Sequence, residues 1–209
     1  MRQSYLKNAA LMTGADVLLR LAGMGLRIWL ANALGGEGMG LYQLVLAVYS
    51  LFVTLATAGV SVAATRLMAE ELARSPAEAR GMLHCLLLAG AGLGVLALVA
   101  QFGLAGLAAK WWLGDVRAAG ALRVSSLGLP WMAVSSVLRG FFIARRQVEP
   151  NVLSQLAEQT VRIGIVWTAL ERADALGWDV GGRCTAVLGA TAISEAVSTG
   201  LMALFYRKE

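Results

Sequence analysis

Residues 81–109 read GMLHCLLLAGAGLGVLALVAQFGLAGLAA, a stretch without a single Lys, Arg, Asp or Glu. Residues 38–65, GMGLYQLVLAVYSLFVTLATAGVSVAAT, form a second uncharged stretch of the same kind. A helix needs about 20 apolar residues to cross the hydrocarbon core of a bilayer, whereas a membrane-spanning strand needs only about 10. Both stretches are far longer than a strand, and a helix satisfies their backbone groups internally. We therefore predict two transmembrane helices here.

The composition of the whole chain agrees with a membrane protein. Of its 209 residues, 58% are hydrophobic and 15% are charged, and the mean hydropathy is +0.66. Soluble domains carry roughly 25% charged residues, so this chain has too few charges to cover a water-exposed surface. The same composition excludes a disordered chain and a disulfide-stabilised secreted domain. We predict an all-α, polytopic membrane protein.

Four further apolar stretches carry one to three charges each and complete a set of six predicted spans. Short loops rich in glycine, proline or charged residues separate the spans. No soluble domain is therefore inserted, and residues 1–209 are predicted to form one six-helix lobe. Pro130 is expected to bend the fourth span. The predicted spans are residues 8–34, 41–66, 82–108, 119–143, 151–171 and 184–206.

The distribution of Lys and Arg between the loops predicts the orientation. Cytoplasmic loops of membrane proteins carry the excess of positive charge. Nine basic residues fall on the side of the chain termini and four on the other, which places both termini in the cytoplasm. The first group is Arg2, Lys7, Arg66, Arg74, Arg80, Arg145, Arg146, Arg207 and Lys208; the second is Lys110, Arg117, Arg172 and Arg183. Because the basic residues lie at the ends of the spans or within them, the net charge of +5 does not indicate a nucleic-acid partner, and we predict a multi-pass protein of the cell membrane.

Ionisable residues within the predicted spans are the candidates for function. A charged side chain at the centre of a bilayer costs about 2.5–3.5 kcal/mol on insertion scales, so such residues usually face a cavity or a partner. In the first span, four residues fall within about 60° of one another on the helix and form one polar stripe. They are Asp16, Arg20, Gly23 and Arg27. Asp16 can pair with Arg20, which follows one turn later.

Similar residues recur in the later spans. Gln155, Glu158 and Arg162 share one face of the fifth span, Arg139 lies in the fourth, and Glu195 lies in the sixth. Within the spans, five arginines stand against three acidic residues, a surplus of two positive charges. The charges counted are Arg20, Arg27, Arg123, Arg139 and Arg162 against Asp16, Glu158 and Glu195. Three structural interpretations stay open. Arg123 and Arg139 could extend to the lipid headgroups, and Glu158 with Arg162 could simply join two helices. Arg20 and Arg27 could likewise serve contacts between helices rather than line a cavity.

A positively charged, water-filled cavity between helices suits an anionic substrate. Guanidinium groups bind phosphate and diphosphate through paired hydrogen bonds. The hypothesis is therefore a transporter of an anionic headgroup, whose lipid tail stays in the bilayer, rather than an enzyme. We expect no cofactor, no metal and no catalytic residue. The single histidine, His84, has no cluster of metal ligands around it, and the outer loops are too short to hold an active site.

Several motifs resemble the stage V sporulation protein B group of polysaccharide/lipid flippases. This group belongs to the multidrug/oligosaccharidyl-lipid/polysaccharide exporter superfamily. The resemblance covers the chain from about residue 5 to its end. It is carried by RLAGMGLR at 20–27, GGEGMGLYQL at 35–44, TAGVSVA at 57–63, RLMAEE at 66–71, VLRGFF at 137–142 and, at 150–162, by Pro150, Ser154, Gln155, Glu158, Gln159 and Arg162.

The resemblance implies one lobe of a two-lobe transporter that flips a lipid-linked oligosaccharide or diphosphate across the cytoplasmic membrane, for cell-wall (peptidoglycan) or spore-cortex assembly. In the related lipid II flippases, arginines of the first helix hold the diphosphate, and Arg20 and Arg27 match that pattern. The implied partners are the lipid bilayer and a second six-helix lobe, from the same polypeptide, a second copy or another chain. Two alternatives stay open: a multidrug or cation antiporter of the same superfamily, and a non-transporting membrane subunit or membrane glycosyltransferase.

Overall fold

The chain begins with a long helix, α1 (Arg2–Thr57), that reverses its direction at Gly35. Gly35 has φ 69° and ψ 178°, a conformation that glycine adopts freely and that residues with a Cβ rarely adopt. The predicted turn between the first two spans is therefore confirmed. We name residues 2–34 the N-terminal arm of α1 and residues 36–57 its C-terminal arm. The computed structural model describes residues 2–57, 59–74 and 76–207.

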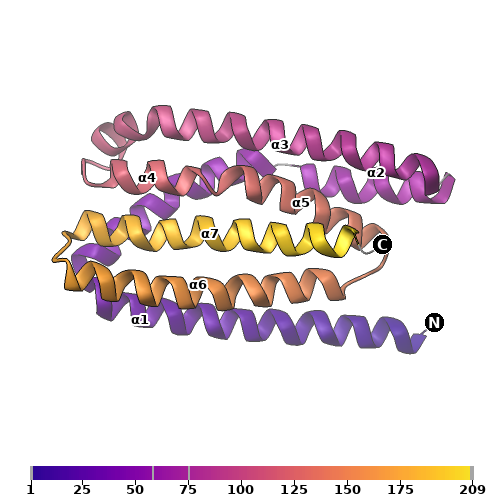
Figure 1. Cartoon of the computed structure of the whole chain (residues 1–209), viewed down its shortest axis with the longest axis horizontal. Helices are drawn as coiled ribbons and strands as arrows, with labels where there is room; N and C mark the ends of the chain where they lie inside the picture. Colours follow the sequence, from indigo (N-terminus) through magenta and orange to yellow (C-terminus); the bar gives the residue numbers. More distant parts are fainter. Residues whose placement is uncertain (1, 58, 75, 208–209) are drawn as a thin grey trace.

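The remaining helices run back and forth along one long axis, and both chain termini lie at the same end (Figure 1). Beyond α1 come α2 (Val60–Arg74), α3 (Pro76–Leu107), the short π-helix η1 (Ala108–Trp112), α4 (Ala118–Ser126), α5 (Leu129–Ala144), α6 (Glu149–Ala175) and α7 (Val180–Arg207). The described residues contain helices and turns but no strand, which confirms the all-α prediction.

Two of the predicted spans are interrupted. Residues 41–66 were expected as one helix, but α1 ends at Thr57 and α2 begins at Val60, with Gly59 at φ 71° between them. Residues 119–143 are divided between α4 and α5, and Pro130 lies in the first turn of α5. Proline is tolerated there because the first-turn N–H groups have no partner within the helix. The expected bend at Pro130 is thus a break between two short helices.

Glycines bring α3 and α5 into close contact. A Cβ added at Gly94 would lie 2.7 Å from the Cα of Pro130 and 2.9 Å from the Cβ of Ala133. A Cβ at Gly90 would lie 2.9 Å from a methyl carbon of Val137. Small residues four apart on one helix face let two backbones approach in this way, as is common between membrane helices. The two glycines therefore serve helix packing.

Within the residues that the structure describes, four helical stretches are long and apolar enough to cross a membrane: Thr13–Arg74, Ala79–Trp112, Ala118–Ala144 and Val180–Arg207. The first contains most of the N-terminal arm of α1, the whole C-terminal arm and α2, and therefore overlaps two of the predicted spans. Helix α6, which contains the predicted span 151–171, is not among them because polar and charged residues interrupt its apolar sequence. That span remains a prediction, and so do the total of six and the arrangement in two lobes.

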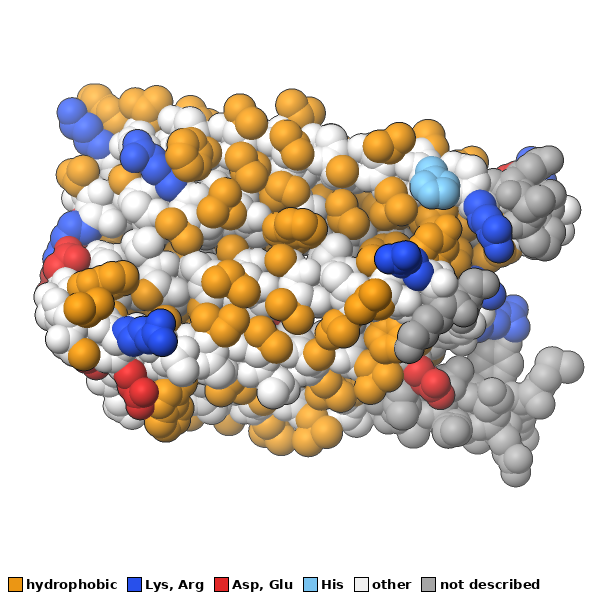
Figure 2. Space-filling view, viewed as in Figure 1, with side chains coloured by type: hydrophobic (Ala, Val, Ile, Leu, Met, Phe, Trp, Pro, Cys, Tyr) orange, Lys and Arg blue, Asp and Glu red, His pale blue; other side chains and the backbone are white. Residues whose placement is uncertain are grey.

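The outer surface of the bundle is apolar. Leu88 is 75% exposed, Val62 72% and Leu96 67%. Figure 2 shows hydrophobic side chains spread over the viewed face, with most charged side chains toward the two ends. Exposed apolar surface of this extent marks a protein whose surroundings are themselves apolar.

Basic residues lie at both ends of the bundle. The end with the termini contains the α2–α3 junction, the α5–α6 turn and the end of α7, and therefore Arg74, Arg80, Arg145 and Arg207 (Figure 1). Lys208 lies outside the described residues, as do the side chains of Arg2 and Lys7. The structure groups the charges as expected, and which end faces the cytoplasm remains a prediction.

At the opposite end, Arg117 links the turn of α1 to the start of α4. Its guanidinium group lies 2.8 Å from Glu37 and 2.8 Å from Asp115. The hydrogen bonds from Arg117 hold the pKa of the Asp115 carboxyl group below its usual value. This exposed cluster fixes the loop between η1 and α4.

Candidate substrate-binding cavity

A cavity of about 630 Å³ opens between the two arms of α1 and the helices α6 and α7. Its wall contains residues from all four segments, so the reversal at Gly35 is needed to build it. The lining residues are Arg20, Gly23, Met24, Leu26, Arg27, Leu30, Tyr42, Leu46, Tyr49, Gln159, Arg162, Thr191 and Glu195. The lining therefore contains both polar and apolar residues, and the polar ones are distributed over α1, α6 and α7.

Arg20 and Arg27 line the cavity from the N-terminal arm of α1. Their separation of seven residues, close to two helical turns, places both side chains on one face. Neither guanidinium group forms an ion pair with any acidic side chain that the structure describes. Asp16 is exposed, does not pair with Arg20 and is not part of the described lining. Neither arginine therefore has its charge neutralised by an acidic side chain within the described part of the chain.

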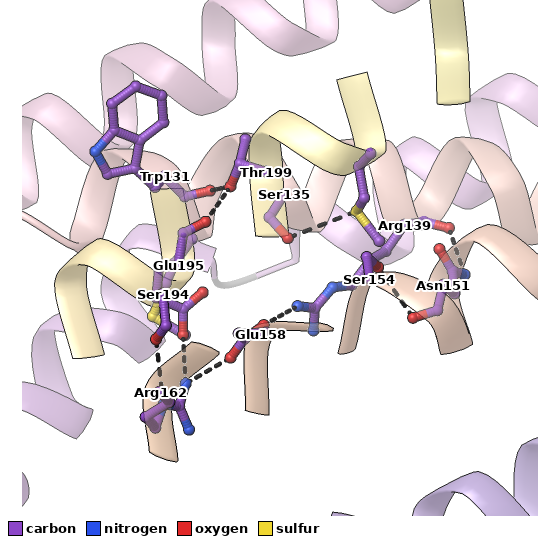
Figure 3. Close-up of polar contacts among 12 residues, drawn as sticks. Trp131, Ser135, Arg139, Asn151, Ser154, Glu158, Arg162, Ser194, Glu195 and Thr199 are labelled. Carbon is purple, nitrogen blue, oxygen red and sulfur yellow. Dashed lines mark hydrogen bonds and ion pairs between the residues drawn. The ribbon is translucent and has the colours of Figure 1, made fainter. Parts of the chain in front are cut away.

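Arg162 on α6 lines the same cavity, and its guanidinium group forms ion pairs with two carboxylates (Figure 3). Its Nη2 lies 2.5 Å from an oxygen of Glu158, one turn earlier on α6, and 3.3 Å from an oxygen of Glu195 on α7. Its Nε donates a hydrogen bond of 3.3 Å to the hydroxyl group of Ser194. The guanidinium group thus joins α6 to α7 and remains 23% exposed.

The ion-pair network continues from Glu158 to Arg139 on α5. Arg139 Nη2 lies 3.4 Å from the second carboxylate oxygen of Glu158. The network of Arg139, Glu158, Arg162 and Glu195 is balanced in formal charge. Glu158 and Arg162 form an ion pair within α6, and of the two only Arg162 is part of the described cavity lining.

Several atoms of this region are buried without a hydrogen-bond partner. They include one carboxylate oxygen of Glu195, the Nε of Arg139 and the hydroxyl group of Ser198. Glu195 is only 4% exposed, yet it lines the cavity beside Arg162. Buried polar groups are normally satisfied, so an incomplete set is typical of functional sites. Glu195 is the one acidic residue in the described lining of this cavity.

Aromatic residues fix the helices around the cavity. Trp29 of α1 stacks on Trp167 of α6, with ring centroids 5.3 Å apart and planes 8° from parallel. Trp167 donates a hydrogen bond from its indole nitrogen to Glu171, at 2.6 Å. Across the cavity, the hydroxyl group of Tyr49 lies 3.3 Å from the sulfur atom of Met132 on α5. The N-terminal arm of α1 is thereby attached to α6.

The structure brings together some of the residues that the sequence suggested. Arg20, Arg27 and Arg162 share one cavity, and Glu158 and Arg139 lie behind Arg162 in the ion-pair network. Gln155 is partly buried on α6 but does not line the cavity, and neither does Asp16. The amide of Gln159, one turn further along α6, takes the place expected for Gln155.

Other lining residues were not predicted. Tyr42 and Tyr49 lie in an uncharged stretch whose pattern gives no sign of a polar face. Glu195 was noticed only as an acidic residue within a span, and the rarity of acidic residues in spans is the signal that could have added it to the candidate site. In the part of the chain that the structure describes, no three His, Cys, Asp or Glu side chains are grouped so as to hold a metal ion.

The fold and the exposed apolar helices define a multi-pass membrane protein, and comparison with known proteins gives its family. Residues 5–208 match the model of the family described as "Polysaccharide biosynthesis protein", and the chain belongs to this family. It is 32% identical over 168 residues to stage V sporulation protein B of Bacillus subtilis (strain 168), which confirms the resemblance found in the motifs. The match covers 79% of this chain and 32% of the sporulation protein. No solved structure gives a significant match.

Proposed function

We propose that the chain is one lobe of a flippase that moves an anionic, lipid-linked glycan precursor across the cytoplasmic membrane. The observation that carries the proposal is the pair of cavity arginines, Arg20 and Arg27, which have no acidic partner among the described residues. Membership in the family of polysaccharide biosynthesis proteins supports a glycan as part of the cargo. The role is transport rather than catalysis.

The chemistry of the cavity suits a phosphate or diphosphate group. The described lining contains three arginines and one glutamate, which gives a formal surplus of two positive charges. Each guanidinium group can donate two parallel hydrogen bonds to a phosphate, and such bonds strengthen where water is partly excluded. Arg20 and Arg27 hold the phosphates, the polar lining residues contact the sugar, and the lipid tail remains in the bilayer.

Arg162 has a separate role in this mechanism. It is shared between Glu158 and Glu195 when no substrate is bound. A phosphate that enters the cavity competes with these carboxylates for the same guanidinium group. Substrate binding therefore weakens the link between α6 and α7, which is the contact that a moving helix pair would have to change.

Transport requires a second lobe. Alternating access occurs when one repeat rocks against another around a central site. The chain spans about a third of the length of stage V sporulation protein B, so the partner lobe comes from the same polypeptide, from a second copy or from another chain. In the membrane, both termini of this lobe face the cytoplasm. The assembled transporter works in cell-wall or spore-cortex synthesis.

A multidrug or cation antiporter is the second candidate, and Glu195 favours it. This carboxylate lines the cavity and keeps one oxygen without a hydrogen-bond partner, as a site for a cation or a proton would. The surplus of arginine in the same cavity opposes a cationic cargo. The two candidates differ in which residues are needed, and the following experiment separates them.

The test is a translocation assay on the full-length or paired protein reconstituted in vesicles. R20A and R27A remove phosphate ligands, and each is expected to abolish flipping of the lipid-linked precursor while the amount of protein in the membrane stays constant. R66A is the matched control, because Arg66 is 81% exposed on α2 and pairs with Glu70 outside the cavity. Normal flipping of the precursor by R20A and R27A would refute the proposed flippase mechanism. Loss of drug efflux in E195Q, with intact glycan flipping, would establish the antiporter.

A further inference from the structure

A second cavity lies at the end of the bundle that holds both chain termini. It has a volume of about 490 Å³ and lies between α2, α3, α5 and α7. It shares no described lining residue with the cavity of Arg20 and Arg27. The flippase proposal assigns it no role, so its chemistry has to be judged separately.

Basic groups from three parts of the chain converge on this second cavity. Arg80 comes from α3, Arg145 from the C-terminal end of α5, and Arg207 from the end of α7. The described lining contains no acidic side chain. His84 follows Arg80 by one turn, and its Nδ1 lies 2.9 Å from the Arg80 carbonyl oxygen, which can only accept a hydrogen bond. The cavity is therefore a concentration of hydrogen-bond donors and positive charge.

The floor of the second cavity is apolar and rigid. Leu83 is fully buried and Phe141 is 5% exposed, and both belong to the core packed between α2, α3 and α5. The ring of Tyr206 meets Phe141 edge to face, with centroids 5.5 Å apart. The guanidinium group of Arg145 lies over the same Phe141 ring, 5.5 Å from its centroid. Packing against Phe141 thus sets the orientation of the Arg145 side chain.

An apolar stripe leads from this cavity along α3. His84, Leu88, Val95 and Val99 fall within about 60° of one another on the helix. Leu88 is 75% exposed, Val95 49% and Val99 61%. Figure 2 shows basic side chains and a histidine beside exposed hydrophobic side chains near this end. A ligand with a charged head and a long apolar chain would find a surface for each part.

We propose that this cavity binds the headgroup of an anionic phospholipid, with one acyl chain lying on the stripe of Leu88, Val95 and Val99. Basic pockets between transmembrane helices on the cytoplasmic side are suited to anionic headgroups, because that leaflet carries the negative surface potential. Arginine adds paired hydrogen bonds to the phosphate. A soluble phosphate would satisfy the arginines but would leave the apolar stripe unused. The inference does not depend on the proposed transport activity.

The test measures phosphatidylglycerol bound to the purified chain, by native mass spectrometry after release from detergent micelles. A basic residue near an anionic surface strengthens binding about fivefold, so R80Q/R207Q is expected to bind phosphatidylglycerol roughly 25-fold more weakly. R66Q is the matched control, because Arg66 lies on α2 outside the lining and pairs with Glu70. R80K/R207K should keep most of the binding, and phosphatidylcholine should bind all variants equally. An equal loss in R66Q and R80Q/R207Q would overturn the proposal.

Two further measurements distinguish a lipid from a soluble phosphate and do not depend on how the variants fold. Glycerol 1-phosphate at millimolar concentration should fail to displace phosphatidylglycerol from the wild-type chain; displacement would indicate a site for soluble phosphates instead. A photoactivatable phosphatidylglycerol should crosslink to peptides containing residues 80–99, 141–145 or 206–207. Crosslinks confined to other helices would refute the assignment.

Discussion

Arg162 takes part in two arrangements at once, because it lines the main cavity and also holds two carboxylates together. Glu158 and Glu195 approach the same Nη2 from α6 and α7. Two acidic side chains with exposures of 12% and 5% would repel each other strongly without a cation between them. Arg162 therefore stabilises the fold as well as contributing charge to the cavity.

R162M is expected to lower the free energy of unfolding by about 3–5 kcal/mol, since it leaves buried carboxylates without their counter-ion. R162M/E195Q should recover part of that loss, because one of the uncompensated charges is gone. R172M is the control, with an exposed arginine on the same helix and an expected change within about 0.5 kcal/mol. Thermal unfolding in detergent measures all three. If R162M and R172M unfold at the same temperature, Arg162 has no structural role.

Residue spacing within one helix was sufficient to find part of the site. The angular count on the first span predicted that Arg20 and Arg27 share a face, and the count on the fifth predicted the pair of Glu158 and Arg162. The same reasoning could not choose between Gln155 and Gln159, since that choice depends on how α6 is turned toward its neighbours. Contacts between helices, such as that of Arg162 with Glu195, are invisible to a pattern on one helix.

At the scale of helices, α3 and α5 pack closely against each other. The backbone of Pro130 lies so near Gly94 that a Cβ there would be 2.7 Å from the Pro130 Cα. The start of α5 cannot move easily, because its first turn is fixed by Pro130 and by the packing of Leu129 in the core. A side chain at position 94 would therefore require the two helices to shift apart.

G94A is expected to destabilise the protein by about 1–3 kcal/mol through overpacking against a fixed backbone. G92A on the same helix is the matched variant, since a Cβ at Gly92 meets no atom within 4 Å. It should be neutral or stabilise the helix by up to about 1 kcal/mol, because alanine is a better helix former than glycine. Unfolding temperatures of the two variants should thus move in opposite directions or differ clearly. Equal temperatures would contradict the contact.

The positions of most helices could be predicted from hydropathy, but their interruptions only in part. The turn at Gly35 was expected from a glycine-rich, charged segment, and Pro130 indicated a bend. The break at Gly59 was not expected, because a single glycine within an apolar stretch is equally compatible with an unbroken helix. Helix α6 was assigned as a span although its polar residues reduce its hydropathy, and only its place beside α1 and α7 explains why they are tolerated.

At the scale of the whole molecule, the two ends of the bundle differ in their basic residues. The sequence assigns nine basic residues to the end with both termini, and three of them, Arg80, Arg145 and Arg207, line the second cavity. It assigns four to the opposite end, namely Lys110, Arg117, Arg172 and Arg183. Orientation in the membrane follows the distribution of Lys and Arg. The end with the termini is therefore expected to face the cytoplasm.

Cysteine labelling at the two ends of α6 tests this orientation. In a C85A/C184A background, a membrane-impermeant maleimide added to intact cells should label L176C and leave E149C unlabelled until the membrane is permeabilised. The pair is matched because Glu149 begins α6 and Leu176 directly follows it, and both are exposed. Labelling of E149C alone would reverse the orientation. Labelling of both from outside would show that α6 does not cross the bilayer.

The left-handed backbone at Gly35 has a mechanical consequence. Arg27 and Tyr42 stand on opposite walls of the main cavity, yet they are successive parts of one continuous polypeptide joined through this glycine. A rotation of a few degrees in φ or ψ of Gly35 would therefore change the width of the cavity farther along both arms. A side chain at position 35 would strain this conformation, so the separation of the two cavity walls depends on the glycine there.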